Sequence, residues 1–340
     1  PTIDYLFPQC HYNDLIQLNY YDATNPQEYS RINLRTYKVD ATNYALQPAR
    51  NSKWELRLNA SWGNNRLAVG YFQERMTDGF RYSSVYSPYA YRKYDASAID
   101  PTTLTAPPAL DGLPYEDVRV LDGFRRASNG TRILKRGIEY QISTERWRPL
   151  CTSLIINGAW FKSTYSNSQM LYSTVNDVVG NQAVSDLYVG VYDTTDGRVN
   201  EQFNTNFMFD TQIPRWGLIF STTVQCLWYV KTTRLRDNPI PHSYISAADG
   251  LIHPYTPEAV DADRLLGYLV KTYNDDAYRT FKVPTAVYVN LKATKQIGRW
   301  LRISAFVNRI VDYLPDYKSN GMSVRRYSDA YFGMEATVTI

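Results

Sequence analysis

Two kinds of side chain alternate along Phe203-Asn204-Thr205-Asn206-Phe207-Met208-Phe209-Asp210-Thr211-Gln212-Ile213. The odd-numbered positions are apolar or threonine, and the even-numbered positions are mostly Asn, Asp and Gln. A helix cannot sort residues in this way, whereas a strand points successive side chains to opposite faces. The stretch therefore predicts a β-strand that has one apolar face and one polar face.

The same alternation recurs along the whole chain. It is clearest at residues 54–62, 138–143, 282–292 and 332–340. Several of the expected strands span about 11 to 15 residues, beyond the ~5–6 residues usual in soluble sheets. A strand that crosses an outer membrane needs roughly 9–11 residues. The alternation indicates about ten or eleven such strands, and no stretch predicts a helix.

Short and long connections alternate between these strands. The short ones are residues 63–65, 146–149, 214–215 and 297–299, and the long polar ones lie near 78–131, 165–200, 231–278 and 312–328. Membrane barrels have short turns at one end and long loops at the other. We therefore expect an all-β fold, an antiparallel transmembrane β-barrel.

Composition supports a surface that meets both water and lipid. The chain has 30 Tyr and 7 Trp, and most of the tryptophans lie near the ends of expected strands. This placement favours two interfacial aromatic girdles, with ordinary core tryptophans as the alternative. The net charge is only +4 and no dense basic block occurs, which argues against nucleic acid as a partner.

The sequence offers no catalytic machinery. Its three histidines, His11, His242 and His253, have no spacing typical of a metal site, and no nucleophile motif accompanies them. The three cysteines are far apart and make no disulfide framework. We therefore expect no catalytic residue, no cofactor and no metal, and a protein that is not an enzyme.

Tyrosines in the long links are the candidate ligand contacts, because their rings stack on sugars and apolar groups while the hydroxyls bond. The alternative is that they pack within the loops or at the membrane interface. The candidates are Tyr82, Tyr86, Tyr89, Tyr91, Tyr172, Tyr188, Tyr192, Tyr244 and Tyr255, and Tyr94 lies in the first of the same links.

Five short segments, in order along the chain, resemble motifs of TonB-dependent outer-membrane receptors. They are Asn43-x-x-Leu46-x-Pro48-x-Arg50 with the following Lys53-Trp54-Glu55-Leu56, then 67–78, 135–139, 304–308 and 331–335. The last is closest to receptors of the Bacteroidetes type. The chain departs from the family pattern at Ala49, where Glu is usual, and at Ile340, where an aromatic residue is usual.

The resemblance implies that residues 1–340 are the C-terminal half of a 22-stranded barrel, a fragment without the plug domain and the first barrel half. Alone, such a chain is expected to form a half-barrel or a curled sheet. Its place would be the Gram-negative outer membrane. Its partners would be membrane lipid, its own plug and, through the plug, TonB, and the resemblance allows a surface lipoprotein lid.

The implied function is active uptake of a nutrient, whether glycan, peptide, siderophore or vitamin. Two sets of strand residues then take opposite roles. The residues expected to face the lumen are Asn204, Asn206, Asp210 and Gln212. Those expected to face lipid are Phe203, Phe207, Phe209, Val287 and Val289. The alternatives are a porin or adhesin-like barrel without a plug, and a soluble carbohydrate-binding β-sandwich.

Overall fold

The computed structural model describes residues 3–193, 196–236, 238–319 and 321–339. The fold is mostly antiparallel β-structure, dominated by one ten-stranded sheet of long strands. Its strands are β3 (Arg50–Trp62), β4 (Asn65–Tyr94), β5 (Tyr115–Ser143), β6 (Thr152–Asn167), β11 (Gly197–Ile213), β12 (Leu218–Leu235), β15 (Phe281–Val283), β16 (Ala286–Ile297), β17 (Leu301–Tyr313) and β20 (Tyr331–Val338). The prediction of a β-rich chain of long antiparallel strands is confirmed.

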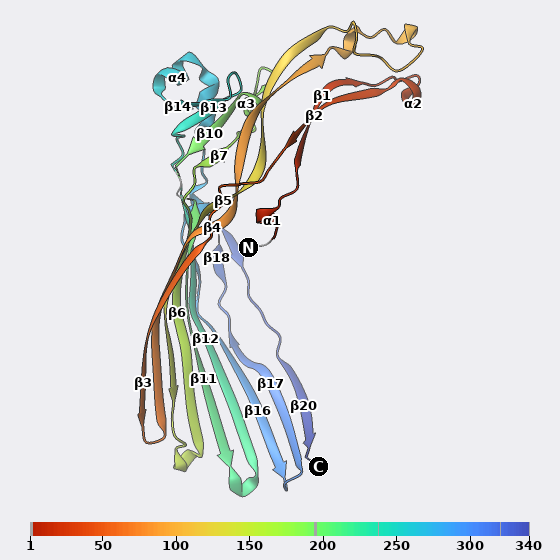
Figure 1. Ribbon diagram of the computed structural model, residues 1–340. Coiled ribbons are helices and arrows are strands. Elements are labelled where there is room, and N and C mark those ends of the chain that lie inside the picture. The colour runs from red at the N-terminus through yellow and green to blue at the C-terminus, as the bar shows by residue number, and fades with distance from the viewer. Residues whose placement is uncertain (1–2, 194–195, 237, 320, 340) are drawn as a thin grey trace.

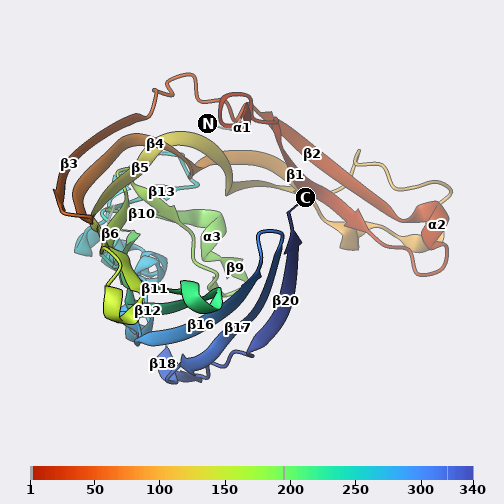
Figure 2. The same ribbon diagram turned by 90° about the horizontal axis from the view of Figure 1, so that it is seen from below.

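Neighbours in the sheet follow chain order, so the sheet is a meander. The order is β20-β17-β16-β12-β11-β6-β5-β4-β3, and β15 pairs with the upper part of β12. Figure 2 shows that the sheet curves into an open trough. No closed barrel forms among the described residues, because β3 and β20 pair on one side only.

All the short turns of the sheet lie at the end drawn lowest in Figure 1. Two of them are 3₁₀ turns, η3 (Arg148–Leu150) and η4 (Pro214–Trp216), that end on a residue with positive φ. That residue is Gly217 in one turn, with φ of 59°, and Cys151 in the other, with φ of 51°. Glycine reaches this region without strain, which fits it to so tight a reversal.

At the opposite end the chain forms a second layer, which we call the upper layer (Figure 1). It holds the four-stranded sheet β14 (Ile252–Pro254), β13 (Ser243–Ser246), β10 (Tyr188–Tyr192) and β7 (Leu171–Ser173). A small apolar core joins it to β5: Leu121, Val189, Val191, Ile245 and Ala247. The hairpin of β1 (His11–Tyr20) and β2 (Arg31–Val39) projects to one side.

The remaining elements are short. They are α1 (Ile3–Leu6), α2 (Pro26–Tyr29), α3 (Val184–Leu187), α4 (Pro257–Ala262), η1 (Ala96–Ala98), η2 (Pro101–Thr103), η5 (Arg264–Leu269), η6 (Asp275–Tyr278), β8 (Val178–Val179), β9 (Gln182–Ala183), β18 (Tyr317–Ser319) and β19 (Met322–Val324). The expectation of no helix is therefore wrong for four short α-helical segments. Within the described ranges, no helix is long and apolar enough to cross a membrane.

The prediction that residues 78–131 form one long link is also wrong in part, because most of them belong to two strands. β4 has 30 residues and β5 has 29, and together they carry the sheet far beyond its other strands. Only residues 95–114 connect them, through η1 and η2. The register breaks near Gly79, so a bulge separates the lower and upper halves of this hairpin. Such bulges increase the local twist of a strand pair.

Candidate functional site

Two adjacent rows of paired residues define the two faces of the large sheet. Directly paired residues of neighbouring strands share a face. The Phe207 row consists of Ala60, Leu67, Ile142, Ile156, Phe207, Val224, Val289 and Val311. The Asn206 row, one residue away on each strand, consists of Asn59, Ala68, Gln141, Asn157, Asn206, Gln225, Tyr288 and Asp312. The first row is wholly apolar and the second almost wholly polar.

The residues expected to face lipid all lie on the face of the Phe207 row. Phe203 and Phe209 are on it by strand alternation, and Val287 is on it because it pairs with Cys226, which pairs with Thr205. The residues expected to face the lumen, Asn204, Asn206, Asp210 and Gln212, share the opposite face. We call these the apolar face and the polar face.

The polar face lines the hollow of the trough. In Figure 1, β11 descends to its turn and β6 lies to its left. The Gln212 N–H donates to the Cys151 carbonyl oxygen beside β6, at 2.9 Å. When an L-residue on a descending strand has its N–H pointing to the left, its side chain points toward the viewer. The Gln212 side chain therefore points toward the viewer of Figure 1. Figure 2 shows that the sheet is hollow on that side, so the apolar face is convex.

Three polar side chains at the centre of the apolar face, those of Tyr140, Thr205 and Trp228, are bonded to one another. Thr205 is only 4% exposed. Its Oγ1 lies 2.6 Å from the Tyr140 hydroxyl oxygen and accepts from the Trp228 Nε1 at 2.8 Å. The polar face is bonded across strands as well, since the Asn206 side chain donates to the Asn157 Oδ1 at 3.0 Å. Neither face therefore leaves these central polar groups without partners.

Tryptophans border the apolar face at both ends. One lies beside each of the four short turns of the sheet, namely Trp62, Trp147, Trp216 and Trp300, and each is more than half exposed. The other three, Trp54, Trp160 and Trp228, lie toward the upper layer. Trp54 and Trp62 are eight residues apart on β3, about 26 Å along the strand. At the ~40° tilt of membrane-barrel strands this span is about 20 Å tall, slightly less than the ~25 Å apolar belt of a membrane barrel.

The candidate tyrosines lie mostly on strands, either of the upper layer or of the upward extension of β4, and not in loops. Tyr82, Tyr86, Tyr89 and Tyr91 are on β4, Tyr172 is on β7, Tyr188 and Tyr192 are on β10, and Tyr244 is on β13. Tyr255 alone lies in a loop, just before α4. The cause is the upward extension of β4 and β5, on which the upper layer packs.

Three of these tyrosines use their hydroxyls inside the upper layer. Tyr192 is fully buried and donates to the Leu269 carbonyl oxygen. Tyr255 donates to the Leu266 carbonyl oxygen at 3.3 Å. Tyr188 donates to the Asp263 carboxylate at 2.5 Å. Burial is the larger cause, and this hydrogen bond the second, that raises the pKa of Tyr188. These residues hold the layer together.

Other candidates pack on neighbouring rings or on the core. Tyr82 stacks on Tyr5 with ring centroids 4.9 Å apart. Tyr86 and Tyr172 pack against the apolar core of the upper layer. Tyr89 is 7% exposed. Tyr244 stacks on the ring of His253, with centroids 5.4 Å apart.

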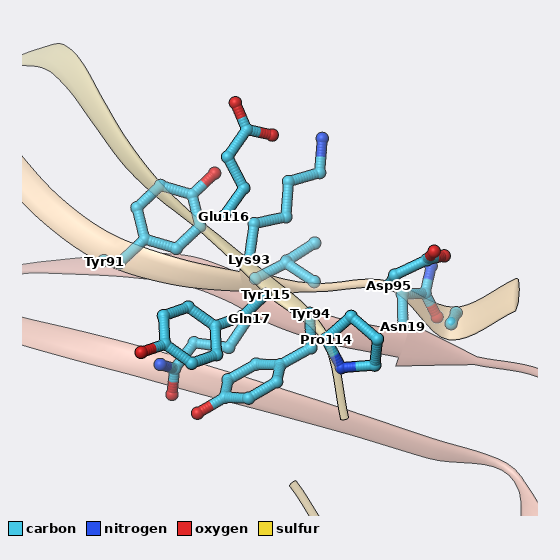
Figure 3. A pocket seen from close by; sticks show the side chains of 11 residues that line it. Gln17, Asn19, Tyr91, Lys93, Tyr94, Asp95, Pro114, Tyr115 and Glu116 are labelled. Atoms are coloured by element: carbon cyan, nitrogen blue, oxygen red, sulfur yellow. The ribbon is translucent and has the colours of Figure 1, made fainter. Parts of the chain in front are cut away.

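Tyr91 lies in the wall of an open pocket between β1 and the tip of the β4–β5 hairpin. The pocket has a volume of about 780 Å³, and Tyr94 and Tyr115 supply two further rings. Figure 3 shows the rings of Tyr94 and Tyr115 on the same side as Gln17, whereas the Tyr91 ring extends the other way with Lys93 and Glu116. The rings of Tyr94 and Tyr115 are 5.6 Å apart at their centroids.

Charge surrounds this aromatic pocket. The Arg92 guanidinium lies 4.5 Å from the centroid of the Tyr115 ring, and Arg92 also pairs with Asp117 at 3.9 Å. Burial is the main cause that raises the pKa of Tyr91, which keeps its hydroxyl neutral. Rings beside charged and amide groups suit a ligand with apolar and hydroxylated faces, such as a sugar or a peptide.

Sequence reasoning missed most of this pocket. It singled out Tyr91 and placed Tyr94 in the same link, but Tyr115 and Gln17 were not identified. Tyr115 pairs with Tyr94 across the hairpin, and that pairing was visible only if residues 78–131 were read as two strands. Gln17 enters from β1, whose position no local pattern reveals.

The described residues hold no group of three or more His, Cys, Asp or Glu side chains that could bind a metal ion. His253 and Asp249 most resemble a catalytic pair, because the His253 Nε2 lies 2.9 Å from an Asp249 carboxylate oxygen. The Asp249 carboxylate also accepts from the Leu251 N–H, and these bonds lower its pKa. No nucleophile accompanies the pair in the contacts described for it. Comparison of the chain with protein-family models, with curated proteins and with solved structures finds no match.

Proposed function

We propose that this chain is part of the barrel wall of a TonB-dependent outer-membrane receptor that takes up a nutrient. The observation that carries the proposal is the contrast between the Phe207 row and the Asn206 row. Eight strands in succession place an uncharged apolar side chain on the convex side and a mostly polar one in the hollow. A sheet that separates lipid from an aqueous interior requires this sorting.

The borders of the apolar face support a membrane setting. Exposed tryptophans lie beside every short turn, and three more follow at the other end of the apolar band. Tryptophan favours the membrane–water interface, where one end of the ring is apolar and the other is wet. The short turns would then face the periplasm, and the upper layer would face the medium.

The uptake part of the proposal draws on the five receptor-like segments. In such a receptor the polar face contacts a plug that TonB pulls, and the outer layer captures the nutrient. The pocket lined by Tyr94, Tyr115 and, from the other face of the hairpin, Tyr91 would contribute to that capture. Its chemistry favours a glycan or a peptide over a siderophore or a vitamin.

A soluble carbohydrate-binding β-sandwich is less well supported. That fold buries apolar sheet faces against a second sheet about 10 Å away. Here Leu56 and Leu58 on β3 are 71% and 63% exposed, and Phe332 and Met334 on β20 are 83% and 76% exposed. The four-stranded sheet of the upper layer packs only on the upward extension of β4 and β5, and across the described residues no second sheet covers the band of the Phe207 row.

Lipids with brominated acyl chains test the membrane setting, because bromine quenches tryptophan on contact. The full chain is refolded into phosphatidylcholine vesicles with and without brominated chains. We expect strong quenching of the tryptophan emission, since the tryptophans border the apolar face. Folded chain whose emission is unchanged by bromine would sink the proposal.

The coding sequence upstream of Pro1 separates the receptor from a porin or adhesin-like barrel. A receptor requires a plug domain with a TonB box on the same polypeptide. A chain that continues upstream with barrel strands but has no plug would favour the passive channel. Nutrient uptake that persists after collapse of the inner-membrane proton gradient would point the same way.

A further inference from the structure

We infer that the convex face carries a binding site for the phosphate groups of outer-leaflet lipids, directly above the apolar band. The inference rests on the proposed function, because it needs the apolar face to be in a membrane. The site is a row of four cations, which we call the cationic row: Arg136 on β5, Lys162 on β6, Lys231 on β12 and Lys282 on β15.

Strand register places these four side chains side by side. Arg136 pairs with Lys162, Lys162 pairs with Glu201, Glu201 pairs with Lys231, and Lys231 pairs with Lys282. Five neighbouring strands therefore contribute one residue each to a continuous row. Four of these residues are positive and one is negative, so the row has a net positive charge.

The row lies on the apolar face, one step beyond its aromatic border. Trp160 is two residues from Lys162 on β6, and Tyr229 is two residues from Lys231 on β12. Side chains two residues apart on a strand point the same way. The Trp160 Nε1 and the Tyr229 hydroxyl both donate to Glu201, at 3.2 and 2.7 Å. The aromatic border and the cationic row are thus bonded together.

The single acid, Glu201, is bonded to the aromatic border and attracts Lys162 and Lys231 on either side, so one negative charge faces four positive ones. Across the described residues, no ion pair within 4.0 Å is formed by any of the four cations. Instead, the Lys231 Nζ lies 4.6 Å from the Tyr229 ring centroid, and the Lys282 Nζ lies 6.0 Å from it. Like charges directly opposite each other destabilise a sheet. An external anion that bridges Arg136 to Lys162 and Lys231 to Lys282 would remove that repulsion.

The position selects the kind of anion. The cationic row lies just beyond the aromatic border that would mark the lipid–water interface, at the end of the sheet away from the short turns. Headgroup phosphates lie at that depth, with acyl chains below them against the Phe207 row. An arginine binds a phosphate through two parallel hydrogen bonds, and a lysine binds it as a point charge. A phosphorylated lipid therefore matches both the charge and the apolar surface beneath it.

Native mass spectrometry of the full chain in detergent measures the binding directly. Phosphatidic acid, which exposes a phosphomonoester, is compared with phosphatidylcholine of the same acyl chains. We expect phosphatidic acid to bind roughly tenfold or more tightly, since each Lys or Arg near an anionic surface contributes about fivefold in affinity. Equal binding of the two lipids would overturn the inference.

A matched pair of variants assigns the preference to the row. The test variant carries Arg136→Gln, Lys162→Gln, Lys231→Gln and Lys282→Gln. The control removes the same charge from the polar face, by Arg57→Gln, Arg66→Gln, Arg198→Gln and Arg234→Gln. The preference for phosphatidic acid is expected to disappear in the first variant and to persist in the second. Loss in both, or in neither, would contradict the assignment.

Two further outcomes are informative. If inorganic phosphate at the same concentration removes the preference, the row takes free phosphate and the lipid assignment is wrong. If brominated phosphatidylcholine fails to quench the tryptophans, the membrane setting itself fails, and this inference fails with it. Quenching without a headgroup preference would refute only the cationic row as a lipid site.

Discussion

A charge introduced on one face of β11 should cost far more than the same charge on the other. Phe207 lies on the apolar face between Ile156 and Val224, and its chain neighbour Asn206 lies on the polar face. The two changes Phe207→Arg and Asn206→Arg introduce the same side chain at the same height. Only the medium that each arginine meets differs between them.

The magnitude follows from the height of Phe207 in the band. Phe207 is four residues below Phe203, at the upper aromatic border, and six above Ile213, at the lower turn. With a strand tilt of ~40°, these spans correspond to about 10 and 15 Å. Phe207 is therefore near the middle of the band, where arginine on the lipid face costs ~2–4 kcal/mol.

The cost at Asn206 is smaller. Its bond to the Asn157 Oδ1 is lost, and such a bond contributes about 0.5–1.5 kcal/mol. The new guanidinium projects into the hollow, where water can solvate it. We therefore expect Phe207→Arg to be the more destabilising change by roughly 1–3 kcal/mol, about a tenfold change in the unfolding equilibrium for every 1.4 kcal/mol.

Heat-modifiable electrophoretic mobility after refolding into vesicles reports the folded fraction, and urea titration reports the free energy of unfolding. The change Phe207→Leu serves as the control and should behave much like the unaltered chain. Equal losses for the two arginine variants would refute the assignment of the faces. A larger loss for Asn206→Arg would show that the hollow, not the convex side, is the dry one.

Two predictions concern the upper layer. The change Tyr192→Phe should destabilise this layer by about 1–3 kcal/mol, because the buried Leu269 carbonyl loses its donor; hydrogen exchange of β10 should rise, whereas Tyr244→Phe should leave it unchanged. The pKa of the Tyr188 hydroxyl is higher in the folded protein than the value of 10.0 expected in the unfolded chain. The protonated hydroxyl therefore stabilises the fold fully below pH 10.0, and this stabilisation is lost as the pH rises through the folded-state pKa. Absorbance titration of tyrosinate should therefore show that the upper layer loosens at alkaline pH. In Tyr188→Phe, which lacks the contact with Asp263, the stability of the layer should no longer depend on this pH change.

The β-rich fold could be predicted because strand alternation is a local property of the sequence. Each strand of the Phe207 row shows its two faces within a few residues, without reference to its neighbours. The pairing order was also accessible, since short turns force successive strands together. The curvature of the sheet and the place of its edges depend on the whole assembly, and no local pattern expresses them.

The upper half of the β4–β5 hairpin was missed for a physical reason. Tyrosine is amphipathic, and both faces of this hairpin contact other parts of the protein, so the alternation is blurred. Pro88 also lies within β4 and pairs with Leu121. Proline lacks the N–H that a strand donates, so it argues against a strand interior. The pocket between β1 and the hairpin was hidden with it.

The two edges of the large sheet constrain any membrane-inserted form of this protein. β3 has 13 residues and β20 has 8, and each pairs on one side only. About half of the backbone groups on such a strand point outward, and each costs several kcal/mol if it meets hydrocarbon without a partner. The total reaches tens of kcal/mol, more than the ~5–15 kcal/mol that typically stabilises a folded domain. Chains refolded into vesicles must therefore pair β3 and β20 with strands of the same polypeptide or of another copy as the apolar face enters the bilayer.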